Sequence, residues 1–287
     1  TTGGLNTGLG LNALYNNTTG TVNTAVGHSA LKANNTGGYN VAIGHESMLA
    51  NTTGITNTAL GNNALRGNTT ASQNVGIGTN ALYTNTTGSD NVAVGHNALD
   101  ANTTGTLNTA VGKDALGANT TASSNTAVGR EAMRDNTTGT NNISMGVSAL
   151  STNTTASSNT ALGTAALRRN TTGPSNTAVG HQAMDSNTTG FENVASGYRA
   201  LYNNTSGETN TAIGTEALRD NQTADNNTAV GKSALMSNTT GELNTAVGRG
   251  ALDASTTAEY NVAVGKDAGS TLTTGSYNAV LGTFALR

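Results

Sequence analysis

Few residues in this chain have the types and spacing of a reactive site. The tripeptide 231–233, Gly-Lys-Ser, ends like a phosphate-binding loop, but the first glycine of that motif would fall on Asn226. His28 and His45 could bridge a metal ion if folding stacks their rings, yet we expect them to be solvated corner residues. Cysteine is absent, which excludes a thiolate nucleophile and a cysteine metal site.

Charged and modifiable residues recur instead of converging. A basic residue precedes an acidic one at 113–114, 130–131 and 266–267, and we expect these to be weak exposed ion pairs. General acid–base chemistry needs two carboxyl groups in a shared cleft, and here the acids are scattered. The run 119–121, Asn-Thr-Thr, matches the acceptor pattern for N-linked glycosylation, but a stacked asparagine ladder beside an inward threonine explains it equally well. The sequence therefore predicts no enzyme, no cofactor and no metal.

The elements that carry these residues follow one period. A glycine occurs every 17 residues from Gly10 to Gly282, without insertion or deletion. A fixed period of this size indicates a solenoid, in which each unit stacks on the last. We number each cycle from the asparagine four residues before that glycine, so Asn108 is position 1 and Gly112 is position 5.

The pattern within a cycle favours strands over helices. Position 2 is mostly Thr or Val, and position 4 is Val, Ile, Leu or Met except at Ser196. Positions 8–9 are mostly Ala-Leu, and positions 12–15 mostly read Asn-Thr-Thr-Gly or Asn-Thr-Thr-Ala. Glycine and β-branched residues disfavour helix, and the variable pairs 6–7, 10–11 and 16–17 carry most of the charge, as exposed corners do. The prediction is an all-β chain, a parallel β-solenoid (β-roll) with one 17-residue coil per cycle and about 17 coils across residues 1–287, as a single continuous domain.

Alternation along a strand predicts which side chains face inward. We expect positions 2 and 4 to face the core, and position 3, which is Ala, Gly or Ser except at Val280, to face outward against another chain. We expect position 14 to face inward and position 13 to face solvent, and the asparagines at positions 1 and 12 to form two amide ladders. The predicted ladder residues are Asn108, Val111, Gly112, Leu116, Asn119, Thr121, Asn125, Val128 and Gly129.

Composition narrows the class of partner. Only 10% of residues are charged and the net charge is −3, which argues against a nucleic-acid surface. No apolar run approaches the ~20 residues of a membrane span. Each coil has few large apolar side chains to offset the ordering of its backbone, and the chain begins and ends within the pattern. We therefore expect a shaft or a fragment of a longer fibre, stabilised by self-association as a homotrimer or an end-to-end filament.

The strand sequence is similar to that of a known family. The segment 41–47, VAIGHES, resembles the VAIGxxS head repeat of trimeric autotransporter adhesins, and 92–95 and 262–265 are close variants. The whole cycle also resembles repeats of phage tail-fibre proteins. The resemblance implies a homotrimeric, left-handed β-roll on a surface-binding fibre. The adhesin repeat is shorter, because this chain adds the Asn-Thr-Thr-Gly wall to each cycle.

Three functions are compatible with these observations. The first is a structural and adhesive fibre shaft, extracellular, on a cell surface or virion, with a surface glycan or protein as receptor. The second is the subunit of a self-polymerising extracellular filament or sheath. The third is an ice-binding solenoid, suggested by the threonine ranks; against it, the rank expected to face outward, position 13, is interrupted by Asn35 and Gln222.

Overall fold

Every regular element of the chain is a three-residue strand. The computed structural model describes residues 2–286, and within them there is no helix. The chain divides into two compact units, 1–141 and 142–287, each described by itself. The first unit holds β1 (Thr7–Leu9), β2 (Thr24–Val26), β3 (Val41–Ile43), β4 (Thr58–Leu60), β5 (Val75–Ile77), β6 (Val92–Val94), β7 (Thr109–Val111) and β8 (Thr126–Val128). The second holds β9 (Ile143–Met145), β10 (Thr160–Leu162), β11 (Thr177–Val179), β12 (Val194–Ser196), β13 (Thr211–Ile213), β14 (Thr228–Val230), β15 (Thr245–Val247), β16 (Val262–Val264) and β17 (Ala279–Leu281).

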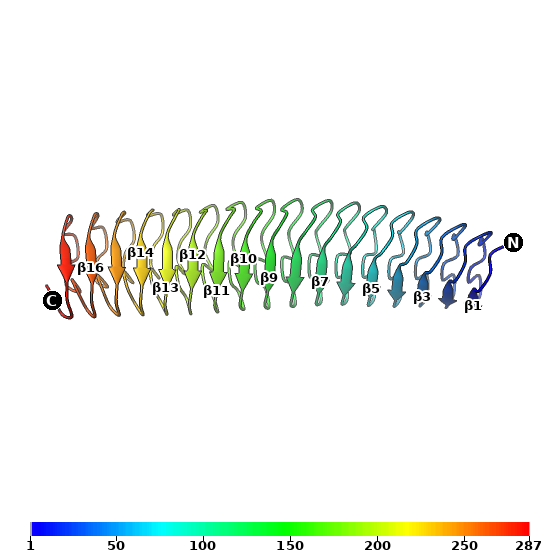
Figure 1. Cartoon of the computed structure of the whole chain (residues 1–287), viewed down its shortest axis with the longest axis horizontal. Coiled ribbons are helices and arrows are strands. Elements are labelled where there is room, and N and C mark those ends of the chain that lie inside the picture. The colour runs from blue at the N-terminus through cyan, green and yellow to red at the C-terminus, as the bar shows by residue number, and fades with distance from the viewer. Residues whose placement is uncertain (1, 287) are drawn as a thin grey trace. The chain divides into compact units, whose positions relative to one another are not determined.

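Consecutive strands in each unit pair in parallel with a shift of one whole cycle. Ala110 of β7 lies opposite Ala127 of β8, and Ala229 of β14 lies opposite Ala246 of β15. Each cycle is therefore one coil, which confirms the predicted parallel β-solenoid. The near-side strands run down the page while successive strands within a unit advance to the left (Figure 1), so the coils wind in a left-handed sense.

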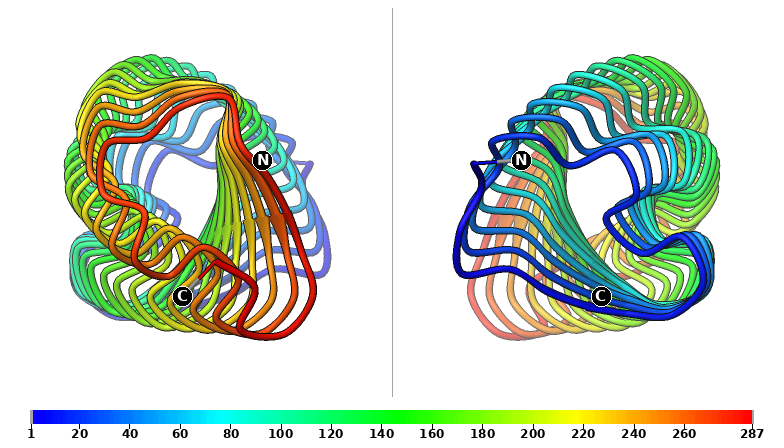
Figure 2. Two further views of the ribbon diagram at one scale, coloured as in Figure 1. Left: turned by 90° about the vertical axis from the view of Figure 1, so that its left-hand side faces the viewer. Right: turned by 90° about the vertical axis from the view of Figure 1, so that its right-hand side faces the viewer.

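The end-on views show each coil as a closed loop with one straight side (Figure 2). The tight corners depend on three residues per coil with left-handed backbone angles, at positions 7, 9 and 17; Asp114, Leu116 and Leu107 are examples, with φ of 56°, 51° and 59°. Position 5 is glycine for a stronger reason. A Cβ on Gly112, where φ is 136°, would lie 2.4 Å from the carbonyl oxygen of Gly129 in the next coil. Only glycine allows the coils to approach this closely.

The predicted direction of the strand side chains is wrong. Ala110 at position 3 is fully buried, whereas Val111 and Val128, expected in the core, are half-exposed on the outer face. The reason is the narrowness of the coil. A Cβ built at position 3 of β5, on Gly76, would lie 3.2 Å from Cγ of Leu65, so the opposite wall already fills the interior. Position 3 is small because of this leucine and not because another chain packs on it.

The core of each coil consists of this small residue and the Ala-Leu pair. Leu116, a predicted ladder residue, is fully buried, as are most residues at position 9. Two residues depart from this pattern, and the larger one fills the space that the smaller one leaves. Position 9 is Gly269 in one coil and position 3 is Val280 in the next, and a Cβ on Gly269 would lie 3.7 Å from Cγ2 of Val280. The larger side chain therefore occupies space that leucine fills elsewhere.

Candidate functional surfaces

The two predicted asparagine ladders are present and share an acceptor. Asn108 and Asn119 are both fully buried. Their side-chain amides donate to the carbonyl oxygen of Ala122, at 2.8 and 3.1 Å. Between coils, the Asn119 amide also donates to Oδ1 of Asn102 at 2.9 Å, and the backbone N–H of Asn125 donates to Oδ1 of Asn108 at 3.0 Å. These hydrogen bonds lock neighbouring coils in register.

This burial also decides the fate of the glycosylation pattern. The position-12 asparagines from Asn34 to Asn238 are fully buried and each donates its amide within the ladder. A transferase cannot reach an amide nitrogen in that setting. In the folded chain, the Asn-x-Thr pattern at these positions is therefore a structural signature and not an acceptor site.

The ladder has a defect near its C-terminal end. Position 12 is Ser255 in place of asparagine, and Leu272 in the following coil. Oδ1 of Asn238 and Oγ of Ser255 are both buried without a hydrogen-bond partner. Each of these oxygens destabilises the fold, because it has lost water without gaining a donor.

The outer face of the strands is a flat, uncharged surface. Positions 2 and 4 point outward in every coil, and no strand contains a charged residue. Large apolar side chains on this face are strongly exposed, including Leu60 at 45% and Ile213 at 43%. Val111 and Val128 lie directly opposite one another in neighbouring strands, so the apolar side chains form a rank within each unit, interrupted in the second unit by Ser196 of β12. We call this surface the strand face.

The wall formed by positions 12–15 of each cycle carries a second row of side chains, which is polar. Thr121 at position 14, predicted to face inward, is exposed, as is the threonine at this position in the other cycles from Thr2 to Thr274; Ser206 is half-buried. Position 13 is the half-buried partner, because its hydroxyl donates to the carbonyl of the next coil, for example Thr103 to Thr120 at 3.0 Å. The prediction for these two positions is therefore wrong, and the outward residue is the one that varies less, being Thr or Ser in every cycle.

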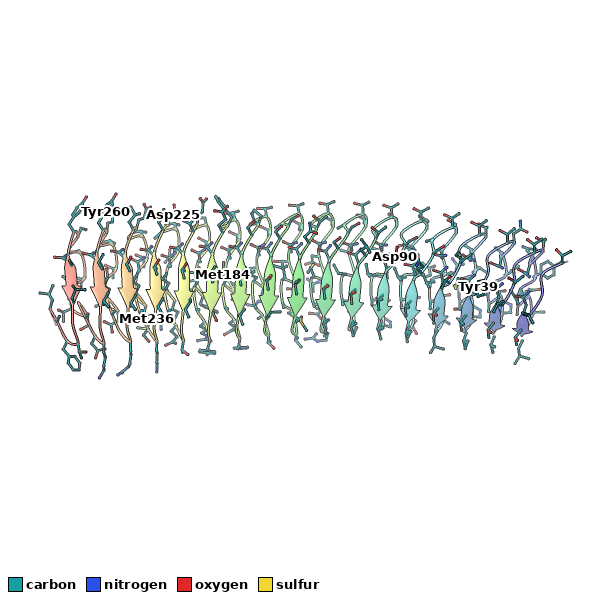
Figure 3. All side chains as sticks on the ribbon, in the orientation of Figure 1. Tyr39, Asp90, Met184, Asp225, Met236 and Tyr260 are labelled. Carbon is teal, nitrogen blue, oxygen red and sulfur yellow. The ribbon has the colours of Figure 1, made fainter. Side chains whose placement is uncertain are left out.

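Most corner residues are exposed or half-exposed, as predicted, and Asp185 is the charged exception among the described residues. This carboxylate is fully buried; one oxygen accepts a hydrogen bond from Arg168 at 3.0 Å, and Oδ1 has no partner. Figure 3 shows the side chains arranged in ranks along each unit, with Tyr260 and Asp225 projecting from the outer edge. Stacking joins equal side chains in neighbouring coils, for example the parallel rings of Tyr260 and Tyr277 at 4.9 Å.

The residues that suggested chemistry remain dispersed over these corners. The His28 and His45 rings stack at 5.1 Å with 11° between their planes. Parallel rings direct their nitrogen lone pairs alongside one another and not toward one point, so a shared metal would require both rings to turn. No group of three or more metal-ligating side chains occurs in residues 2–286. The backbone N–H groups of Gly231 and Ser233 donate to neighbouring coils at 2.8 and 2.9 Å and are not available to a phosphate.

The predicted ion pairs form on the surface. Lys113–Asp114, Arg130–Glu131 and Lys266–Asp267 are separated by 3.6, 2.7 and 4.0 Å. The sequence did not indicate the pairs between coils, Arg66–Glu46 at 2.7 Å and Arg168–Asp185 at 3.0 Å. The hydrogen bond from Arg66 lowers the pKa of Glu46.

Two other carboxyl groups have their pKa raised by their surroundings. Partial burial, with the charge of Asp114 adding to it, raises the pKa of Asp100. Burial and the charge of Asp267 raise the pKa of Asp253 in the same manner. No pocket is found in the described part of the chain, so these acids lie on open corners and not in a cleft.

Fold and surface together define a class of protein: a β-solenoid repeat protein that presents regular ranks of side chains. The chain matches no family model, no curated protein and no solved structure. Residues 2–286 contain no helix of the length and hydropathy needed to cross a membrane.

Proposed function

We propose that the chain is a structural and adhesive fibre shaft, whose strand face is covered by further copies of the same chain. The observation that carries this proposal is the uncharged apolar rank, exemplified by Leu60 and Ile213, which repeats on the outer face of each unit. Soluble monomers rarely leave so regular an apolar surface open to water. A second copy offers a rank with the same spacing, so the two surfaces match along their whole length.

The area of the strand face bears on this role. Eight strands in the first unit, at ~4.8 Å each and about 10 Å wide, give roughly 400 Å². The nine strands of the second unit give a similar area. A stable interface buries about 800 Å² on each partner. Either unit alone therefore offers about half of that area, so the proposed assembly requires the strand faces of both units to be covered.

The regularity of the coils supports a role as a fibre. Every coil repeats the same outward ranks, so a receptor on a cell or virion surface would meet many equal weak sites on one body. Linked weak sites gain strongly through effective concentration. We propose an extracellular setting for this activity, with a surface glycan or protein as the receptor.

Native mass spectrometry combined with light scattering tests the covered strand face. We expect a closed homotrimer for the wild type. The double substitution Val94→Lys and Val111→Lys places two charges on the strand face and should release monomers. The matched control, Thr79→Lys and His96→Lys, places the same charges at position-6 corners of adjacent coils and should remain trimeric. A wild-type monomer at high concentration would refute the proposal, and mass that grows continuously with concentration would indicate a filament instead.

A further inference from the structure

The threonines at position 14 bond to the next coil through their backbone, but their side chains are exposed. Their hydroxyls make no hydrogen bond with another part of the described chain, whereas the position-13 hydroxyls of Thr52, Thr69 and Thr86 each donate to the next coil at 3.0 Å. Exposure also means that little packing depends on them. We call the outward residues the threonine rank: 2, 19, 36, 53, 70, 87, 104, 121, 138, 155, 172, 189, 206, 223, 240, 257 and 274.

Comparison of the cycles shows that a hydroxyl is nonetheless required there. Every other outward position tolerates change: position 2 alternates between Thr and Val, and the hydrogen-bonded position 13 admits Asn35 and Gln222. The threonine rank departs from threonine once, at Ser206, which keeps the hydroxyl and loses the branched methyl. Position 14 lies in a bend and not in a strand, so strand propensity does not explain the preference for threonine. The constraint must therefore come from something outside the coil that contacts the hydroxyls.

The geometry of the wall restricts what that partner can be. Most position-13 hydroxyls donate to the next coil, at 2.9 Å for Thr188 and 3.4 Å for Thr120, and parallel stacking repeats the adjacent threonine rank every ~4.8 Å within each unit. Position 13 adds largely hydrocarbon to the surface, because its hydroxyl is turned to the backbone. The wall has no pocket, and positions 13 and 14 contain no aromatic or charged residue. A small ligand needs a concave site, so the partner must be extended, uncharged and periodic.

We propose that the threonine rank binds ice. Its spacing is close to the a-axis repeat of hexagonal ice, and an even row of hydroxyls beside hydrocarbon can hold water molecules in lattice positions. A crystalline polysaccharide is also extended and periodic, but the wall lacks the aromatic rings on which sugar rings stack. The proposal is independent of the fibre assembly, because the threonine rank and the strand face lie on different walls of each coil.

Thermal hysteresis and partition into a growing ice hemisphere, measured on the full chain, test this inference. The wild type should show both activities. Thr87→Val, Thr104→Val and Thr121→Val together remove three adjacent hydroxyls and keep the branched shape, and this variant should lose most of the hysteresis. A second variant with lysine at the same three positions should lose both activities. Native mass should be unchanged in each, which separates this result from a failure of assembly.

A matched control uses the same chemistry on the strand face. Thr58→Val, Thr109→Val and Thr126→Val change threonines at position 2, where valine occurs naturally, and should keep wild-type hysteresis. Absence of hysteresis in the wild type, or an equal loss in this control, would overturn the proposal. Retention on microcrystalline cellulose or chitin without ice partition would overturn it in favour of a polysaccharide ligand.

Discussion

Ser255→Asn is expected to stabilise the chain by repairing the break in the position-12 ladder. The new amide would donate to Oδ1 of Asn238, which is now buried without a partner. It would also donate to the carbonyl of Ala258, as the Asn221 amide does to Ala224 at 3.0 Å. The unpaired Oγ of Ser255 disappears at the same time.

The magnitude follows from counting buried polar atoms. Two unpaired oxygens are removed and one is created, because the new Oδ1 would face Leu272. A buried oxygen without a donor costs about 1–3 kcal/mol, and the added hydrogen bond contributes ~1 kcal/mol. The net expectation is a gain of about 2–4 kcal/mol in the free energy of unfolding. Adding Leu272→Asn should increase the gain, because it gives the last oxygen a donor.

Urea denaturation measures the gain, and hydrogen exchange of the backbone amides at 255–261 shows whether it is local. The converse substitution, Asn119→Ser, copies the defect into an intact stretch and should lose about 2–4 kcal/mol, since Oδ1 of Asn102 then has no donor. Ser237→Asn makes the same chemical change at a half-exposed corner and should be nearly neutral. If Ser255→Asn is neutral or destabilising, the two oxygens are already hydrated and the reasoning is refuted.

Three further predictions concern packing, backbone conformation and pH. Val280→Ala should lower the free energy of unfolding by about 2 kcal/mol, because two buried methyl groups are lost and a cavity remains. Adding Gly269→Leu should restore most of this loss, and additive effects of the two substitutions in urea denaturation would contradict the idea that Val280 fills the space left by Gly269. Leu107→Asn should raise the free energy of unfolding by about 1 kcal/mol, because asparagine tolerates the φ of 59° at this exposed corner better than leucine, and an unchanged urea midpoint would argue against strain there. Burial raises the pKa of Asp100 above its ordinary 3.8, so the unfolded chain ionises first and the free energy of unfolding falls as pH rises from the ordinary pKa through the raised one. Asp100→Asn should therefore raise the melting temperature at neutral pH and leave it unchanged below the ordinary pKa. An equal rise at both pH values would exclude titration as the cause.

The stacking of equal residues could be predicted from the sequence because it depends on repetition alone. Glycine recurs at every position 5 and asparagine at every position 1. Such an unbroken period indicates that equivalent residues of successive cycles stack on one another. The buried amide network around Asn108 and Asn119 follows from the same logic, because a stacked amide both donates and accepts. The break at Ser255 was also present in the sequence as a departure from the pattern.

Whether each side chain faces the core or the solvent could not be predicted from repetition. A strand of three residues offers only two choices, and the aliphatic residue at position 4 suggested the wrong one for Val111 and Val128. Thr121 is a second case, because a position that is always Thr or Ser suggests burial and is nonetheless exposed. The pairing of Gly269 with Val280 was the available hint, because one exception compensates another only if position 3 lies inside.

The amino-acid sequence alone determined the period, the parallel stacking and the two asparagine ladders, because each follows from residues that recur at equal distance along the chain. Only the tertiary structure decided which ranks face water. A coil of 17 residues encloses so little volume that one leucine, Leu116 or its equivalent, fills it and leaves room opposite for no more than the alanine of position 3. The aliphatic and threonine ranks were thereby placed on the outside, and with them the surfaces that carry both proposals.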